Sequence, residues 1–108
     1  MPTQLLIITA LESELKRVEL PPEVNIVYSG IGKINATLTT IKAIHEYQPN
    51  TILNFGTAGK VNTQVEGLIE ICKVIQRDMQ TEPLAPRGRT PFCNKPYEYF
   101  SDSGEYTC

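Results

Sequence analysis

The sequence contains no tryptophan, one histidine and three cysteines among its 108 residues. The cysteines, Cys72, Cys93 and Cys108, match no zinc-binding spacing, and an odd number of them is a poor framework for disulfides. We therefore expect free thiols in a reducing cytoplasm. With one histidine and no paired metal-type spacing, no metal site is expected. His45 falls in the last turn of a predicted helix, where the helix dipole favours a positive charge, so a structural role is sufficient to explain it.

The sequence also lacks a strong charge bias and a long apolar run. Its net charge is −2 and its isoelectric point is about 5.4, which argues against a nucleic-acid-binding surface, because such surfaces are usually basic. No apolar stretch approaches the roughly 20 residues that span a bilayer. The N-terminus shows neither a basic region nor a cleavage site, so no signal peptide is expected. These features predict a cytoplasmic protein with neither nucleic acid nor membrane as a partner.

Two glycine turns follow predicted strands, and neither completes a phosphate-binding motif. The segment "NFGTAGK" (54–60) has Asn54 where a P-loop needs its first glycine, and Val61 where it needs a hydroxyl. The segment "SGIGKIN" (29–35) has Gly30 and Gly32 but Asn35 in place of the third glycine of a dinucleotide fingerprint. Neither turn is therefore a standard phosphate cradle.

The first third of the chain predicts a strand, a helix and a second strand. The apolar run at 5–8 is typical of a strand that is buried on both faces, as in a parallel sheet. Thr9 and Glu12 fit a capping box, which predicts a short helix over about 10–18 that ends before Pro21-Pro22. Residues 24–28 then form the second predicted strand.

Further along, the pattern predicts a longer helix and two more strands. The helix covers 33–47, stops at Pro49 and carries one apolar stripe, formed by Ile34, Leu38, Ile41 and Ile44. Strands are predicted over 51–55 and, longer, over 67–75. This alternation predicts an α/β layered fold.

From residue 76 onward the sequence becomes rich in proline and polar turns. We expect a long loop region over 76–108 with short hairpin strands around 97–100 and 105–108. The last residues read as the start of a strand. The expected organisation is a single α/β domain over 1–108 that is incomplete at its C-terminus and forms the N-terminal portion of a longer domain.

Three motifs in order resemble a known superfamily. The segments "TALESEL" (9–15), "SGIGKINAT" (29–37) and "NFGTAGKV" (54–61), followed by "GLIEICKVI", resemble the purine nucleoside phosphorylase/uridine phosphorylase superfamily. Within it, the likeness is greatest to the 5′-methylthioadenosine/S-adenosylhomocysteine nucleosidase family. The resemblance implies a three-layer sandwich with a mixed, mainly parallel twisted sheet. It also implies a homodimer that hydrolyses purine nucleosides in purine and methionine salvage, without metal or cofactor.

The resemblance assigns a catalytic role to one carboxylate. Glu14 matches the family glutamate that activates the attacking water, which suits a reaction that passes through an oxocarbenium-like state. Glu12, two residues earlier, is the rival candidate, although it also fits the capping box with Thr9. Alternatively, Glu14 is a solvated helix residue near Lys16 or Arg17.

The resemblance implies that the glycine turn at 54–60 binds the substrate. Thr57 matches the family serine or threonine that contacts the ribose and the attacking water, and its neighbours Gly56 and Ala58 complete the turn. Asn54 stands where the phosphorolytic branch has a phosphate-binding arginine. A neutral amide cannot replace a guanidinium that clamps phosphate, so the resemblance favours water as the nucleophile.

Two further positions carry weaker implications. Ile31 matches the family's G-I-G-K turn near the site, where Lys33 is more simply a solvated residue at the helix start. Leu84 falls near the apolar position that covers the 5′-substituent pocket of the neighbouring subunit. The family's purine pocket, its ribose-binding Met-Glu pair and its general acid are expected beyond position 108. A phosphorylase and a non-catalytic nucleoside-binding or assembly module therefore stay open as alternatives.

Overall fold

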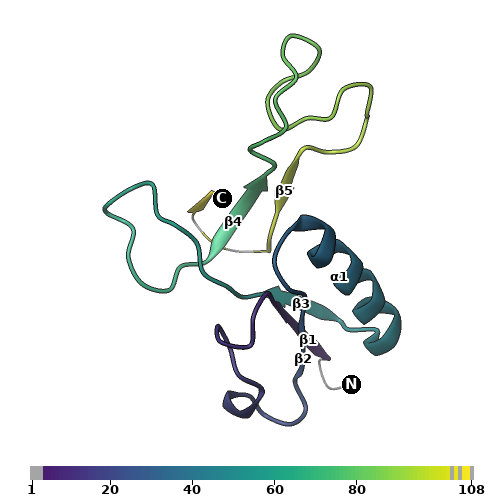
Figure 1. Cartoon of the computed structure of the whole chain (residues 1–108), viewed down its shortest axis with the longest axis vertical. Coiled ribbons are helices and arrows are strands. Elements are labelled where there is room, and N and C mark those ends of the chain that lie inside the picture. Colours follow the sequence, from purple (N-terminus) through teal and green to yellow (C-terminus); the bar gives the residue numbers. More distant parts are fainter. Residues whose placement is uncertain (1–3, 103, 105, 108) are drawn as a thin grey trace. The chain divides into compact units, whose positions relative to one another are not determined.

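The computed structural model describes residues 4–102, 104, 106 and 107 (Figure 1). The chain divides into two compact units, Met1–Gly59 and Lys60–Cys108, and each is described by itself. In the part of the chain that is described, no helix is long and apolar enough to cross a membrane.

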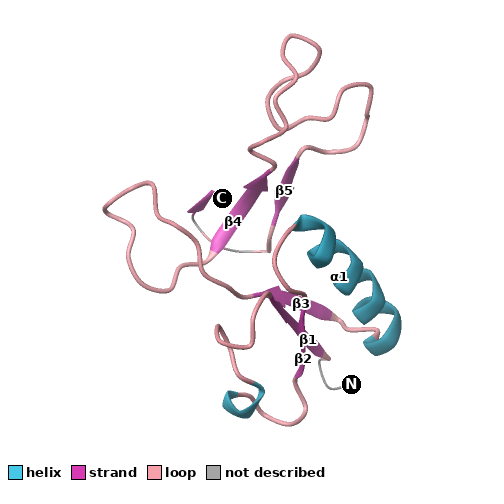
Figure 2. Ribbon diagram, in the orientation of Figure 1, coloured by secondary structure: helices cyan, strands magenta, loops and turns pink. Residues whose placement is uncertain are grey.

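In its described residues, the first unit is a parallel three-stranded sheet with one α-helix. Strand β1 (Leu5–Thr9) lies between β2 (Asn25–Tyr28) and β3 (Thr51–Asn54), and both neighbours run parallel to it. Helix α1 (Lys33–Tyr47) connects β2 to β3 (Figure 2). The predicted α/β class is confirmed, as are the strands expected over 5–8, 24–28 and 51–55, each to within one residue at either end. The helix expected over 33–47 is observed with those bounds.

The core of this unit lies between β1 and α1. Leu6 and Ile8 on β1 and Ala43 on α1 are at most 4% exposed, and Val27 and Tyr47 pack against them. The apolar stripe of α1 is not what the helix buries: its members are 41–85% exposed, namely Ile34, Leu38, Ile41 and Ile44. The helix therefore contacts the sheet through its small residue Ala43 and its last residue Tyr47.

The predicted helix over 10–18 is wrong. A helix starting at Ala10 would use the carbonyl of Ala10 to accept from the N–H of Glu14. Instead the Ala10 carbonyl accepts from the N–H of Gly30 at 2.9 Å, and the N–H of Glu14 donates to Leu11 in a turn at 3.0 Å. Backbone pairing with the segment after β2 thus continues past Thr9 and prevents the helix. A short 3₁₀ helix, η1 (Arg17–Glu19), is formed in its place.

Thr9 provides a test of this correction. It is 0% exposed, and its hydroxyl has no hydrogen-bond partner among the described residues. Burial of an unpaired hydroxyl costs free energy, so Thr9→Val is expected to raise the free energy of unfolding by about 1 kcal/mol. Urea denaturation of the two proteins measures it.

Thr40→Val is the matched control, because the Thr40 hydroxyl donates to the Ala36 carbonyl at 2.6 Å and its removal should bring no gain. A loss of about 1 kcal/mol in Thr9→Val would instead indicate a helix cap, and would contradict the strand assignment.

The second unit is a smaller mixed sheet. Strand β4 (Ile71–Ile75) pairs antiparallel with β5 (Glu98–Phe100) and parallel with β6 (Tyr106–Thr107). The strand expected over 67–75 is formed only from Ile71. Gly67 has a φ of +74°, so the backbone is not extended where the strand was expected to begin. A strand is observed at 98–100, close to the one expected around 97–100, but the expected hairpin is wrong: among the described residues, β5 and β6 lie on opposite sides of β4 and each pairs with it. The expected strand over 105–108 is observed at 106 and 107, and Glu105 and Cys108 lie outside the described residues. Cys72 and Cys93 are free thiols.

Candidate functional site

The structure brings Glu14 and Thr57 together in the first unit. The backbone N–H of Thr57 donates to Oε2 of Glu14 at 2.8 Å, and the Thr57 hydroxyl donates to the same oxygen at 3.1 Å. The two residues are 43 positions apart in sequence, so this contact depends on the fold. Glu14 is half-buried. One carboxylate oxygen is therefore held by two donors from the turn after β3.

The sheet explains why these residues meet. Strands β1 and β3 are adjacent and parallel, with Ile8 opposite Asn54, so the segments that follow them leave the same edge of the sheet. The N–H of Phe55 extends this pairing by donating to the Ile8 carbonyl at 3.0 Å. Carboxyl ends of parallel strands are where α/β folds place their ligands.

Gly56 allows the turn to approach the carboxylate closely. A Cβ atom at this position would lie 3.2 Å from Oε2 of Glu14, which is tighter than an ordinary van der Waals contact. A side chain here would require the carboxylate to shift by a few tenths of an ångström. Ala58 follows in the same turn and is exposed.

The two bonds leave Glu14 suited to act on a ligand. Oε2 is fixed by Thr57, and Oε1 takes part in neither bond, so it can accept a hydrogen bond from a water or a hydroxyl. A carboxylate held in this way can orient a water and take its proton. Glu12, the rival candidate, is exposed in the turn two residues earlier, and it is Glu14 that meets Thr57.

The G-I-G-K turn lies beside the start of the segment that carries Glu14, because the Gly30 N–H donates to Ala10. Ile31 is 73% exposed in this turn, and its carbonyl accepts from the Asn35 side chain at 2.8 Å. Gly30 and Gly32 both have positive φ, of +78° and +100°, which favours glycine at both positions. Ile31 is thus presented to solvent by a turn that contacts the Glu14 segment.

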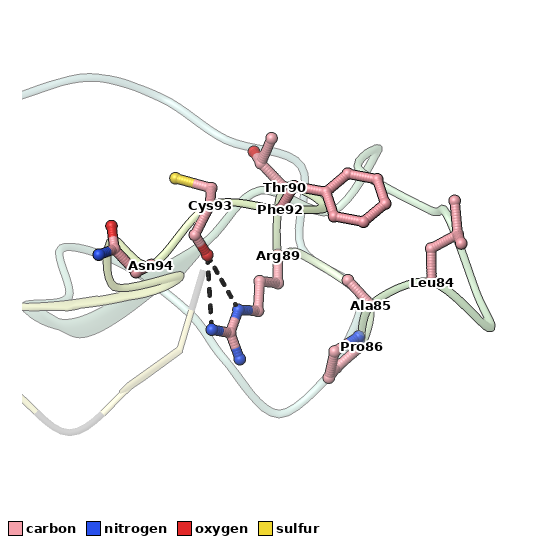
Figure 3. A pocket seen from close by; sticks show the side chains of 8 residues that line it. All are labelled: Leu84, Ala85, Pro86, Arg89, Thr90, Phe92, Cys93 and Asn94. Carbon is pink, nitrogen blue, oxygen red and sulfur yellow. Dashed lines mark hydrogen bonds between the residues drawn. The ribbon is translucent and has the colours of Figure 1, made fainter.

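Leu84 belongs to the second unit and lines an open hollow of about 510 Å³ there (Figure 3). The cation of this hollow serves the loop itself: Arg89 donates from Nε and Nη2 to the Cys93 carbonyl at 3.4 Å each, and its guanidinium lies 5.8 Å from the centre of the Tyr97 ring. Among the described residues, no carboxylate lines the hollow. The described residues hold no group of three or more histidine, cysteine or acidic side chains that could bind a metal.

The chain is similar to known proteins over most of its length. The model of the phosphorylase superfamily matches residues 10–108. A 5′-methylthioadenosine/S-adenosylhomocysteine nucleosidase of Hydrogenovibrio crunogenus is 38% identical over 72 residues, which are 64% of this chain and 31% of that protein. The nucleosidase of the same name from Lysinibacillus sphaericus is 41% identical over 44 residues, covering 41% of this chain and 19% of that protein.

A third nucleosidase of that name, from Staphylococcus aureus (strain JH9), is 45% identical over 40 residues, which are 37% of this chain and 18% of that protein. The matched part of the chain thus spans between about a fifth and a third of the length of these relatives. No solved structure matches the chain.

Proposed function

The chain belongs to the phosphorylase superfamily, and from this we propose that it is part of a nucleosidase that hydrolyses the N-ribosidic bond of a purine nucleoside. The observation that carries the proposal is the contact between Glu14 and Thr57 at the carboxyl ends of β1 and β3. In this proposal Glu14 is the general base, and the turn 56–58 holds the ribose and the attacking water.

The chemistry suits the arrangement. Breaking a ribosyl–base bond builds positive charge on the sugar, and a carboxylate beside the sugar can both stabilise that charge and deprotonate water. Thr57 keeps the carboxylate in place through Oε2. In this proposal, Oε1 accepts the hydrogen bond from the attacking water. The names of the similar proteins favour an adenosine-type substrate with a 5′-thio substituent.

Asn54 supports water rather than phosphate as the nucleophile. It is the last residue of β3, is exposed, and carries no charge that could bind an anionic co-substrate. The proposal extends to a homodimer with the complete three-layer sandwich. In that dimer, Leu84, which is 68% exposed, would cover the 5′-substituent in the partner's site.

The choice between hydrolysis and phosphorolysis is tested by the phosphate dependence of base release. The chain, expressed with any sequence that continues its reading frame, is expected to release adenine from 5′-methylthioadenosine at the same rate with and without inorganic phosphate. The sugar product should be the free sugar and not its 1-phosphate. Strict dependence on phosphate would make the protein a nucleoside phosphorylase and refute the hydrolase.

A non-catalytic nucleoside-binding or assembly module is the second candidate. In that case the same protein would bind 5′-methylthioadenosine in a calorimeter but release no adenine. Turnover together with binding would exclude this alternative.

A further inference from the structure

The segment that carries Glu14 has little regular structure to hold it in place. Residues 11–16 form no helix. A single backbone hydrogen bond lies inside the segment, from the Glu14 N–H to the Leu11 carbonyl at 3.0 Å. A helix would have fixed the direction of Glu14 through repeated backbone bonds. Something else must therefore position its carboxylate against Thr57.

The start of the segment is fixed by backbone bonds to the residues after β2. Ser29 donates to the Thr9 carbonyl at 3.0 Å, and Gly30 donates to the Ala10 carbonyl at 2.9 Å. These bonds end four residues before Glu14. They fix where the segment begins and leave its far side to another contact.

Tyr28 supplies the contact on the far side. It is the last residue of β2, and its hydroxyl donates to the Leu15 carbonyl at 2.6 Å in a partly buried position. Leu15 directly follows Glu14, so this bond fixes the Leu15–Lys16 peptide group, one residue beyond the one that carries the carboxylate. The ring is rigid and anchored in the sheet, and a buried tyrosine hydroxyl usually finds such a partner.

We infer that Tyr28 is a positioning residue for Glu14, and this inference rests on the proposed function. With Ser29 and Gly30 on one side of Glu14 and Tyr28 on the other, both sides of the segment are fastened to the end of β2. Tyr28 would affect the reaction only by positioning the Glu14 carboxylate, because its hydroxyl is hydrogen-bonded to the Leu15 carbonyl.

Tyr28→Phe removes the hydroxyl and keeps the ring. It is expected to lower kcat for adenine release about threefold to tenfold, the range of one hydrogen bond, with KM changed less than about twofold. In a protein that already carries Glu14→Gln, adding Tyr28→Phe should lower kcat less than about twofold further, since the group being positioned is gone. The hydrogen-exchange rate of the Glu14 amide, measured by NMR, should rise by a factor similar to the factor by which kcat falls.

Tyr47→Phe is the matched control. Tyr47 is the last residue of α1, packs against the core cluster, and lies before the start of β3 rather than at its end. It should leave both kcat and the exchange of Glu14 unchanged. An equal loss in both single variants, or a full additional loss in the double variant, would show a general effect on the fold and overturn the inference.

The outcome separates the two proposals. If the unaltered protein releases no adenine, the proposed function fails, and the exchange of the Glu14 amide then decides whether Tyr28 holds the segment. Faster exchange in Tyr28→Phe would support the role of the tyrosine, and unchanged exchange would refute it. If the protein is active and Tyr28→Phe retains its full kcat, only the inference about Tyr28 is overturned.

Discussion

Replacement of Glu14 with glutamine is expected to lower kcat for adenine release by about 10²- to 10⁴-fold, the contribution typical of general acid–base catalysis. Glutamine has nearly the same shape, and its amide oxygen can still accept from the N–H and hydroxyl of Thr57, which hold Oε2 at 2.8 and 3.1 Å. The substitution therefore removes the base and keeps the position of the side chain. Steady-state kinetics with 5′-methylthioadenosine measures the effect, and KM should change much less than kcat.

Glu12→Gln is the matched control for this variant. Glu12 is exposed in the turn two residues before Glu14, so the same chemical change is made on the same segment. Its kcat should stay within about twofold of the unaltered protein, as for surface substitutions away from a site. A large loss in Glu12→Gln with full activity in Glu14→Gln would give the catalytic role to the rival carboxylate.

The sequence predicted the elements whose pattern and packing agree. The strand at 5–8 is a continuous apolar run, and in the structure Leu6, Ile7 and Ile8 are all buried at the centre of the sheet. Helix α1 has both a regular period and a stop at Pro49, and its bounds were predicted without error. Where the local pattern and the tertiary pairing agree, the sequence alone is sufficient to predict the element and its bounds.

The failures arise where a distant segment decides the local conformation. The capping box of Thr9 and Glu12 is a local signal, and the N–H of Gly30 overrides it by occupying the Ala10 carbonyl. The stripe of α1 was a correct periodic pattern, but periodicity does not say which face contacts the sheet, and Ala43 makes that contact. Both outcomes depend on pairings that no short window of sequence contains.

The candidate site divides in the same way. Glu14 and Thr57 were assigned from motifs that resemble a family, and the hydrogen bonds between them follow from the adjacency of β1 and β3. Tyr28 had no signal of its own, because an apolar strand that ends in tyrosine is unremarkable in sequence. Its bond to the Leu15 carbonyl depends on the segment 10–16 not being a helix, which the sequence did not predict.

Leu6→Ala is expected to produce the largest loss of stability in the first unit, about 2–5 kcal/mol. Leu6 is 0% exposed on the central strand and shares a core cluster with Ile8 and Ala43. The cavity left by the leucine side chain would be closed only in part, since it is bounded by a paired strand and a helix. Urea denaturation measures the loss. The hydrogen exchange of β1 amides is used to monitor it, so that the first unit is observed by itself.

Leu38→Ala makes the same chemical change at a half-exposed position on α1, where 52% of the residue is exposed and alanine favours the helix. It should cost less than about 1 kcal/mol. A loss as large as that of Leu6→Ala would mean that the apolar face of α1 is covered in solution, and would contradict a core centred on Leu6.

The effects of Leu6→Ala and Glu14→Gln should separate cleanly. Leu6 lies inside the sheet and Glu14 lies on the segment beyond its edge, so removing the leucine should lower the folded fraction and leave kcat per folded molecule nearly unchanged. Glu14→Gln should do the reverse, since a half-buried carboxylate outside the core adds little to folding. If Leu6→Ala lowered kcat in fully folded protein as much as Glu14→Gln does, the core would also control the position of the Glu14 carboxylate, and the expected separation of stability from catalysis would be wrong.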